Sequence, residues 1–265
     1  MNMTDNDTDS GITIRASEST HWYTRDGVPR YTVTGKNGKE RNTTLRDARV
    51  ESLVPSVTTV LNIAAKPALT AWLQKQVLLA ALTLPRLEGE PEADYISRII
   101  DDSKEQGRSA ADAGTDIHAS IQNFFEKKPV HKHHHSVFAT DKKLEEVFGV
   151  QEWISERSFA HELGFGGKTD LYLPASENNK GIVVDIKTKE FYSEADVVAY
   201  DEHLLQLAAY RVGLGVPEAR CGNLFVSRKI PSLVVFKEWT EEDLKRGWEM
   251  FTHLLMYWQL KNKHT

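Results

Sequence analysis

Cysteine is almost absent from this chain of 265 residues, in which Cys221 stands alone. A single cysteine excludes a disulfide framework and indicates a reducing, cytosol-like compartment. Long apolar runs are also missing, because none approaches the roughly 18 residues of a membrane span, and the acidic, polar residues 1–10 do not resemble a signal peptide. We therefore expect a cytoplasmic protein with no membrane partner, and we expect residues 1–19 to form a disordered tail.

The chain is long enough to build a sizeable core, because 40% of its 265 residues are hydrophobic. We expect a single domain over residues 20–265. Its N-terminal part, 20–130, would hold short strands and helices, and its core would occupy 131–265.

The most informative stretch is residues 181–189, Gly-Ile-Val-Val-Asp-Ile-Lys-Thr-Lys. Its apolar and β-branched residues predict a buried strand, on which Asp185 and Lys187 share one face because side chains alternate. A carboxylate and an ammonium on an apolar strand cost desolvation energy unless they are paired or bind a ligand. The two residues are either a structural ion pair or a metal ligand beside a lysine that activates water.

The spacing of this pair does not decide between the two interpretations, because acid-x-Lys occurs five times in the chain. The other four pairs lie in polar, helical or loop-like surroundings, where a solvated charged face is the ordinary explanation. They are Asp102/Lys104, Glu126/Lys128, Asp141/Lys143 and Asp243/Lys245.

A further acid precedes this strand, in residues 164–173, Gly-Phe-Gly-Gly-Lys-Thr-Asp-Leu-Tyr-Leu. The run predicts a strand, and the short, turn-rich connection that follows predicts a hairpin with Asp170 across from Asp185. Two facing carboxylates repel each other unless a cation lies between them, and hard oxygen ligands suit Mg²⁺ or Mn²⁺. Gly167-Lys168-Thr169 is not the end of a phosphate-binding loop, because Glu162 stands where that motif needs glycine and a strand follows instead of a helix.

The order of these motifs resembles the PD-(D/E)xK nuclease superfamily. Gly-Gly-x-x-Asp ends at Asp170, Asp-x-Lys begins at Asp185, and Gln206-x-x-x-Tyr210 follows on a predicted helix. Within the superfamily the chain is most similar to the RecB-like exonucleases, because a helical histidine, His118, precedes these motifs.

Two upstream segments, Pro55-Ser-Val-Thr-Thr-Val-Leu and Leu69-Thr-Ala-Trp, are similar to the N-terminal part of mitochondrial genome maintenance exonucleases and related phage proteins. The resemblance covers residues 52–212 and implies an α/β fold, with a restriction-endonuclease-like core of mixed β-sheet flanked by helices and an N-terminal helical region. It implies Mg²⁺ or Mn²⁺ as the cofactor. The single cysteine excludes the iron–sulfur cluster of some RecB-like relatives, including CRISPR-adaptation nucleases.

The resemblance also implies a role for each matching residue. The metal ligands would be His118, Asp170, Asp185 and the backbone carbonyl of Ile186. Lys187 would orient or deprotonate the attacking water and steady the charge on the phosphate, while Gln206 and Tyr210 would support Lys187 and the scissile phosphate. Glu156 falls where such enzymes often carry an acid on the first core strand. The residues expected to contact nucleic acid are Lys168, Lys189 and Arg211.

These residues also have ordinary structural explanations. His118 lies between two apolar residues on a predicted helix, where a histidine often packs instead of binding metal. Gln206 and Tyr210 are four residues apart, so they share one helical face, which could be plain surface. We interpret the histidine cluster at 131–135 as a solvated loop, because consecutive histidines cannot easily face one ion.

The function that the resemblance implies is a metal-dependent DNA exonuclease that hydrolyses phosphodiester bonds from single-stranded or frayed ends. Recombination, repair or replication in a bacterium or a phage-infected cell would suit it. The alternatives are an endonuclease of the same superfamily and a non-catalytic nucleic-acid-binding module. The net charge of −5 weighs mildly against DNA binding, since proteins that grip phosphates usually have a basic face.

Hydrophobic periodicity and turn residues predict the order of the elements. We expect short strands within 20–50, a helix from Pro55-Ser56 to about residue 82, and a second helical region over 92–127 with an interruption near Gly107 or Gly114. The elements expected after these are a helix at 138–148, strands at 152–162, 167–174 and 181–188, a helix at 195–213, strands at 222–228 and 232–239, and a final helix that Thr240 caps and that ends near 261.

Overall fold

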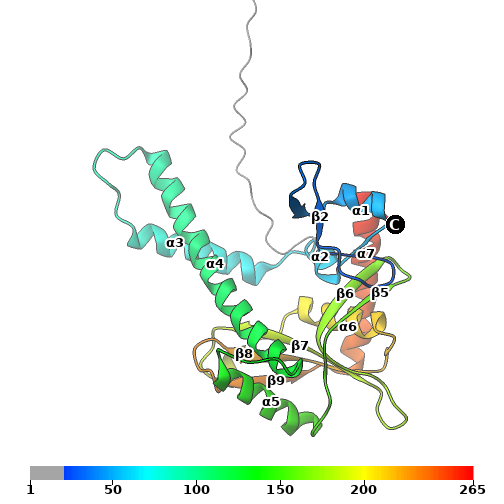
Figure 1. The fold of residues 1–265 in the computed structure, drawn as a ribbon. Coiled ribbons are helices and arrows are strands. Elements are labelled where there is room, and N and C mark those ends of the chain that lie inside the picture. The colour runs from blue at the N-terminus through cyan, green and yellow to red at the C-terminus, as the bar shows by residue number, and fades with distance from the viewer. Residues whose placement is uncertain (1–20, 265) are drawn as a thin grey trace, which may run out of the picture.

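A five-stranded mixed sheet of order β5-β6-β7-β8-β9 lies at the centre of the computed structural model, which describes residues 21–264 (Figure 1). The strands are β5 (Ile154–His161), β6 (Phe165–Leu173), β7 (Ile182–Lys189), β8 (Arg220–Ser227) and β9 (Val234–Glu238). Only the pair β7 and β8 is parallel among these neighbours. The α/β fold class with a mixed sheet and flanking helices is as predicted, whereas the tail expected at 1–19 lies outside the described residues.

Helices cover both faces of this sheet. Helices α4 (Glu92–Phe125) and α5 (His134–Phe148) pack on one face, and α6 (Asp201–Gly213) packs on the other, with α7 (Glu241–Asn262) against α6. Helix α6 is the crossover that connects β7 to β8, and such a crossover is what a parallel pair of strands requires.

The side chains of β7 alternate between the two layers. Val184 and Ile186 belong to the apolar cluster that includes Ile121 of α4, and Val183 belongs to the cluster that includes Leu204 of α6. Because the period of a strand is two residues, the acid and the lysine of β7 are on the α6 side together with Val183.

The N-terminal part contains the short strands predicted within 20–50, namely β1 (Trp22–Tyr23), β2 (Thr32–Thr34) and β3 (Glu40–Asn42), and β4 (Val54–Pro55) follows. It also contains a helix that was not predicted from the sequence, α1 (Leu45–Glu51). Thr44 caps this helix, because its side chain accepts from the amide of Asp47 while the carboxylate of Asp47 accepts from the amide of Thr44.

The long helix predicted from Pro55 to about 82 is wrong, because the structure divides it into α2 (Val57–Leu61) and α3 (Pro67–Thr83). Pro67 lacks an amide hydrogen and disfavours helical geometry at Lys66, so a helix can begin at this proline but not pass through it.

The interruption expected near Gly107 or Gly114 is absent, because α4 runs unbroken for 34 residues, a length of about 50 Å. Both glycines lie where another element comes close. A Cβ atom on Gly107 would meet the ring of Trp72 in α3 at 3.9 Å, and one on Gly114 would meet Oγ1 of Thr188 in β7 at 2.5 Å.

Two helix starts also differ from the predictions. Helix α5 begins at His134, so His134 and His135 are helical and not part of a loop. Helix α6 begins at Asp201 instead of near 195, after a single 3₁₀ turn at Glu194–Asp196. The predicted cap of the last helix is confirmed, because Oγ1 of Thr240 accepts from the amide of Asp243.

Helix α3 and residues 92–108 of α4 extend beyond the sheet as a helical hairpin, which we call the arm (Figure 1). Only Ala80 of α3 is buried. Within residues 21–264, no helix has the length and apolar character needed to span a bilayer.

Candidate active site

The predicted hairpin is formed by β6 and β7. Their paired positions end at Leu171 and Val184, so the next residues along the two strands, Asp170 and Asp185, lie across from each other. The ladder does not continue there. Instead, Oδ2 of Asp170 accepts the amide hydrogen of Ile186 at 2.5 Å, and the two strands separate at this point. The candidate site is built around this fork.

Lys187 connects β7 to helix α6. Its Nζ lies 3.0 Å from Oδ2 of Asp185 and donates to Oε1 of Gln206 at 3.0 Å. Because an ammonium only donates, Gln206 must present its oxygen to Lys187 and its amide nitrogen to Tyr210, whose hydroxyl lies 2.9 Å from Nε2. The predicted grouping of these four residues on one face of the sheet and helix is therefore present.

His118 reaches the fork from the α4 side. It lies one turn after Gly114, whose missing side chain lets α4 approach β7. Its Nε2 is 2.9 Å from the carbonyl oxygen of Ile186 and 3.5 Å from Oδ2 of Asp170. A carbonyl only accepts, so Nε2 must carry the hydrogen in this arrangement.

The charges at the fork perturb one another. Burial raises the pKa of Asp170 to about 6, and the nearby carboxylate of Asp185 adds to the rise. For His118 burial acts to lower the pKa, yet Asp170, the Ile186 carbonyl and Asp185 together raise it above its ordinary value. The carboxyl of Asp170 is therefore difficult to ionise, chiefly because it is buried, and the neighbouring carboxylates make the imidazole of His118 easier to protonate.

Lys187 does not have the lowered pKa that a general base needs at neutral pH. Burial acts to lower its pKa, but Asp185 and Asp170 outweigh burial, and the pKa of Lys187 lies above its ordinary value. The two carboxylates that raise this pKa are the predicted metal ligands, so a bound cation would offset their effect on Lys187.

Asn223 and Trp239 are in contact with the site, and the sequence reading did not include them. Asn223 pairs with Asp185 in the parallel register of β7 and β8, and its Nδ2 donates to Oδ2 of Asp185 at 2.9 Å. Trp239, just after β9, donates from Nε1 to Oδ1 of Asn223 at 2.8 Å. The sequence signal for Asn223 is its place directly before the apolar run Leu-Phe-Val of a predicted strand. An amide buried there needs hydrogen-bond partners.

Glu156 lies on β5 across from Asp170, between the paired positions Ser155 and Arg157. Its φ of 57° is in the left-handed region, which costs about 1–3 kcal/mol for a residue other than glycine and is concentrated at functional sites. Its carboxylate forms an ion pair with Lys168. Lys168, which was predicted to contact nucleic acid, is thus paired with a carboxylate of the protein.

The other two lysine and arginine predictions fare differently. The prediction that Arg211 contacts nucleic acid is wrong. Its side chain is 3% exposed and paired with Glu241 of α7, so it cannot contact DNA in this fold. Lys189 is half-buried, with Nζ 3.0 Å from the carbonyl of Val198 and over the ring of Tyr200, and burial lowers the pKa of Lys189 to about 8.

The predicted metal ligands are neighbours but do not converge on one point. Within residues 21–264, no group of three or more His, Cys, Asp or Glu side chains is arranged to hold a metal ion. The hollow between His118 and Asp170 has no room for a water molecule. Asp185 turns to the α6 side, toward Lys187 and Asn223, whereas His118 is on the α4 side.

The donor chemistry nonetheless fits Mg²⁺. This ion is commonly held by one or two carboxylates and completes its shell with water and substrate phosphate oxygens. Asp170 and Asp185 supply two carboxylates on adjacent strands. His118 and the Ile186 carbonyl satisfy each other by a hydrogen bond, which a cation bound to either would replace.

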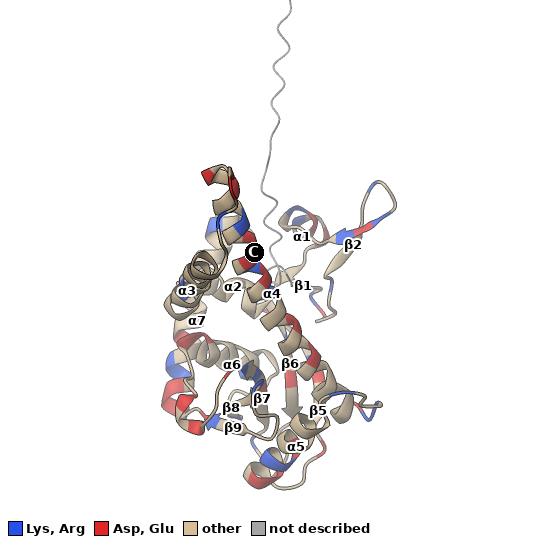
Figure 2. Cartoon of the chain, turned by 90° about the vertical axis from the view of Figure 1, so that its left-hand side faces the viewer, with Lys and Arg blue, Asp and Glu red and all other residues tan. Residues whose placement is uncertain are grey.

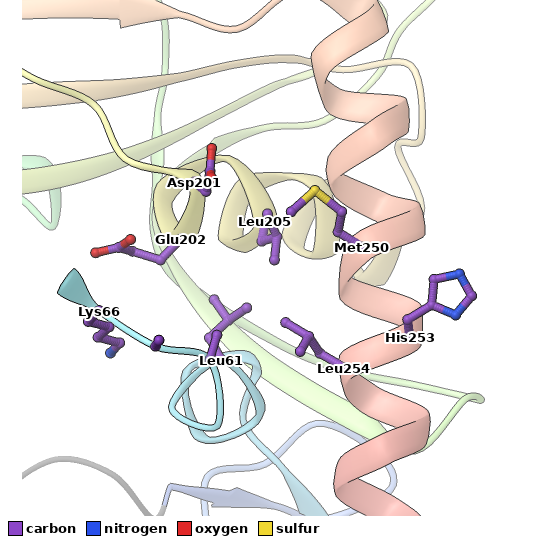
Figure 3. Close-up of a pocket in the computed structure, with 10 residues that line it drawn as sticks. Leu61, Lys66, Asp201, Glu202, Leu205, Met250, His253 and Leu254 are labelled. Atoms are coloured by element: carbon purple, nitrogen blue, oxygen red, sulfur yellow. The ribbon is translucent and has the colours of Figure 1, made fainter.

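A larger cavity of about 400 Å³ lies between α2, α6 and α7 (Figure 3). The apolar side chains of Leu61, Leu205, Met250 and Leu254 line its interior, and Glu202 lies at its edge. None of the predicted site residues lines it.

No protein family model and no curated protein matches the sequence. Among solved structures, the chain is similar to a candidate exonuclease from Eubacterium rectale, with a TM-score of 0.42 and 12% identity over 58% of this chain and 69% of that one. It is also similar to the protein SSO0001, with a TM-score of 0.28 and 16% identity over 71% of this chain and 86% of the other. Similarity at this level does not identify a function.

Proposed function

We propose that this chain is a Mg²⁺- or Mn²⁺-dependent DNA exonuclease. The observation that carries the proposal is the meeting of Asp170, Asp185 and Lys187 where β6 and β7 separate. Two carboxylates beside a half-buried ammonium, at the end of a strand pairing, are expensive to maintain for stability alone.

The reaction would add water across a phosphodiester bond, so that one product ends in a phosphate and the other in a hydroxyl. A divalent cation, when bound, would acidify the water and neutralise non-bridging phosphate oxygens. Asp170 and Asp185 would hold that cation, and His118 and the Ile186 carbonyl lie beside Asp170.

Lys187 would act as a charged donor in this reaction. Its contacts with Asp185 and Gln206 keep an ammonium donor at the fork, where it can orient the water or hold a phosphate oxygen. Gln206 keeps the ammonium in place through a 3.0 Å hydrogen bond, and Tyr210 fixes the amide of Gln206. Because Tyr210 is buried, its role is to position Gln206 and not to touch the scissile phosphate.

Single-stranded or frayed DNA ends are the proposed substrate, and this preference follows the resemblance to RecB-like exonucleases. Figure 2 shows Lys and Arg interspersed with Asp and Glu on α4, α5 and α7. A local cation such as Lys189, instead of a broad basic face, would therefore contact phosphates away from the reacting bond. Few phosphate contacts predict a shallow dependence of DNA binding on salt.

The test compares two DNA substrates under the same conditions. We expect the full chain to degrade end-labelled linear single strands in Mg²⁺, to stop when EDTA is added, and to leave covalently closed circles intact. Equal cleavage of circles would instead favour the endonuclease. DNA binding without cleavage of either substrate, in Mg²⁺ and in Mn²⁺, would favour the non-catalytic module.

A lysine substitution tests the site itself. We expect Lys187→Met to lower the cleavage rate by at least about 100-fold while DNA binding changes little, because the ammonium acts on the reacting phosphate. Lys237→Met is the matched control. Lys237 lies on β9 of the same sheet, and its ion-pair partner is Glu194, which is not a residue of the candidate site. If Lys187→Met cleaved DNA as fast as the wild type, the fork would not be the active site.

A further inference from the structure

We propose that Asn223 and Trp239 are positioning residues that fix the carboxylate of Asp185 beside Lys187, on the α6 side of β7, and thereby set the affinity for a cation bound by Asp170 and Asp185. This inference rests on the proposed function, because it concerns the same carboxylate. It assigns to β8, and to the residue that follows β9, a part in a site that the sequence motifs place on α4, β5, β6, β7 and α6.

The contacts form a chain of two hydrogen bonds across three strands. Asn223 is fully buried and lies beside Asp185 in the β7–β8 register. Its Nδ2 is 2.9 Å from Oδ2 of Asp185, and its Oδ1 is 2.8 Å from Nε1 of Trp239. Trp239 follows β9 directly and is half-buried.

The chemistry of these groups fixes the orientation of the amide. An indole nitrogen can only donate a hydrogen bond, so Trp239 must face the oxygen of Asn223 and never its nitrogen. The amide nitrogen is then forced to point at Asp185, where it meets an acceptor. Without the indole donor, no group near β9 would favour the amide oxygen of Asn223 over its nitrogen. The amide could then turn its oxygen toward Asp185.

A neutral donor suits this position better than a second cation would. Asp185 already accepts from the ammonium of Lys187, which offsets its negative charge. Asn223 holds Oδ2 without adding a positive charge, so the carboxylate keeps the charge that attracts a metal ion. Asp185 is also 4% exposed, and a buried carboxylate without such a partner would be displaced toward other donors.

The hydrogen-bond chain therefore makes the affinity for a metal ion depend on a residue two strands away. Partners of this kind are worth about 10- to 100-fold in metal affinity or activity in other metal sites. Truncating Asn223 would remove the donor entirely, whereas replacing the indole by a phenyl ring would keep the packing and remove only the group that fixes the amide.

The test is a calorimetric titration of the full chain with Mn²⁺ and no DNA. We expect Asn223→Ala to weaken Mn²⁺ binding about 10- to 100-fold and Trp239→Phe to weaken it by a smaller factor. The matched control is Ser227→Ala, which removes a buried hydrogen-bonding group from the same strand, one that donates to the Phe191 carbonyl and does not contact Asp185. It should lower stability and leave Mn²⁺ binding unchanged.

The outcomes separate this inference from the proposed function. Mn²⁺ binding by the wild type that is unchanged in both Asn223→Ala and Trp239→Phe would overturn the positioning role, while the nuclease proposal would stand. Wild-type binding that the two variants weaken, in a chain that cuts neither linear nor circular DNA, would support the positioning role and overturn the nuclease. A wild type that binds no Mn²⁺ would overturn both. Thermal melting identifies a variant that fails to fold, and Trp239→Phe then carries the test.

Discussion

Strands β7 and β8 of the central sheet carry Val184 and Leu224, which are completely buried, whereas α3 of the arm carries Leu78 and Leu82 at 65% and 83% exposure. Helix α3 has a single charge, Lys75, in 17 residues, so it is no more polar than a core strand. The sheet is covered on both faces by helices, whereas in the part of the chain that the structure describes α3 packs chiefly against α4.

This difference shows that composition alone does not decide burial. An apolar strand inside a sheet receives two neighbours from its ladder and a layer on each face, so even its polar side chains must find partners. A helix in a two-helix hairpin can bury only the stripe that faces its partner. The same apolar residues therefore contribute stability in β8 and contribute little on the outer side of α3.

Helix α4 belongs to both regions. Its first half pairs with α3 in the arm, and its second half buries Ile117 and Ile121 against the sheet and brings His118 to the fork. The close approach at Gly114 lets α4 reach β7 and sets the position of His118, one turn later on the same helix.

The largest effect is expected at the centre of the sheet. Leu224→Ala should lower the free energy of unfolding by about 2–5 kcal/mol, because the lost side chain leaves a cavity that β8 cannot close. Chemical denaturation monitored by circular dichroism measures this. A loss below about 1 kcal/mol would contradict the enclosed packing on which the comparison with the arm depends.

The second effect is a loss of unfolding free energy at acidic pH. Burial lowers the pKa of His203 to about 3, with Lys187 adding to the shift, and Nδ1 accepts the Tyr200 amide at 3.2 Å. Because the folded pKa is below that of the unfolded chain, the stabilisation is complete above about pH 6.5 and is lost as the pH falls toward 3. Between pH 7 and 5 the protein should lose about 2 kcal/mol of unfolding free energy through this residue.

His203→Asn, whose side chain can still accept from the Tyr200 amide, should reduce this loss between pH 7 and 5. The measurement is denaturant unfolding at several pH values. Identical curves for His203→Asn and wild type would contradict the buried, neutral state of His203.

A smaller effect tests the junction of the two regions. Gly114→Ala should destabilise the fold by about 1–3 kcal/mol despite the better helix propensity of alanine, because its Cβ would meet Oγ1 of Thr188 at 2.5 Å. Combining it with Thr188→Ala should restore stability, since the oxygen is then gone. Thr188→Val keeps the branch and should not rescue. Equal rescue by both would show that the steric contact is not the cause.

The smallest effect is expected on the outer side of the arm. Leu78→Ala and Leu82→Ala should each change the unfolding free energy by no more than about 0.5 kcal/mol, because both side chains are already exposed. The same denaturation experiment applies, with Ala80→Ser as the buried counterpart in the same helix. A loss of 2 kcal/mol or more at Leu82 would mean that the arm is covered in solution.

Much of the fold was predictable where the signal is local. The strands β6 and β7, their hairpin and the shared face of Asp185 and Lys187 follow from a two-residue period and a short turn. The helix boundaries were less predictable. Pro67 divides a run whose periodicity continues on both sides, and Gly114 is a contact point with another element and not a helix breaker.

Part of the candidate site could not be predicted for a similar reason. Arg211 carries the charge expected of a DNA contact, yet α7 packs on α6 and buries it against Glu241. The raised pKa of Lys187 depends on the sum of burial and two carboxylates, and only coordinates give that sum. The sequence marked Asn223 only as an amide beside apolar residues. Its partner, 38 residues away, could not be known because it comes from the parallel register of two strands.

From the order of its residues alone, this chain specifies a pair of strands with an acid on each and a lysine two residues beyond the second acid, because backbone period and turn length act between near neighbours. The tertiary structure decided which groups meet them. His118 arrives through the approach of α4 at Gly114, and Asn223 arrives through the crossover of α6. Such contacts join elements far apart in the chain, and only the packing of whole layers against one another determines them.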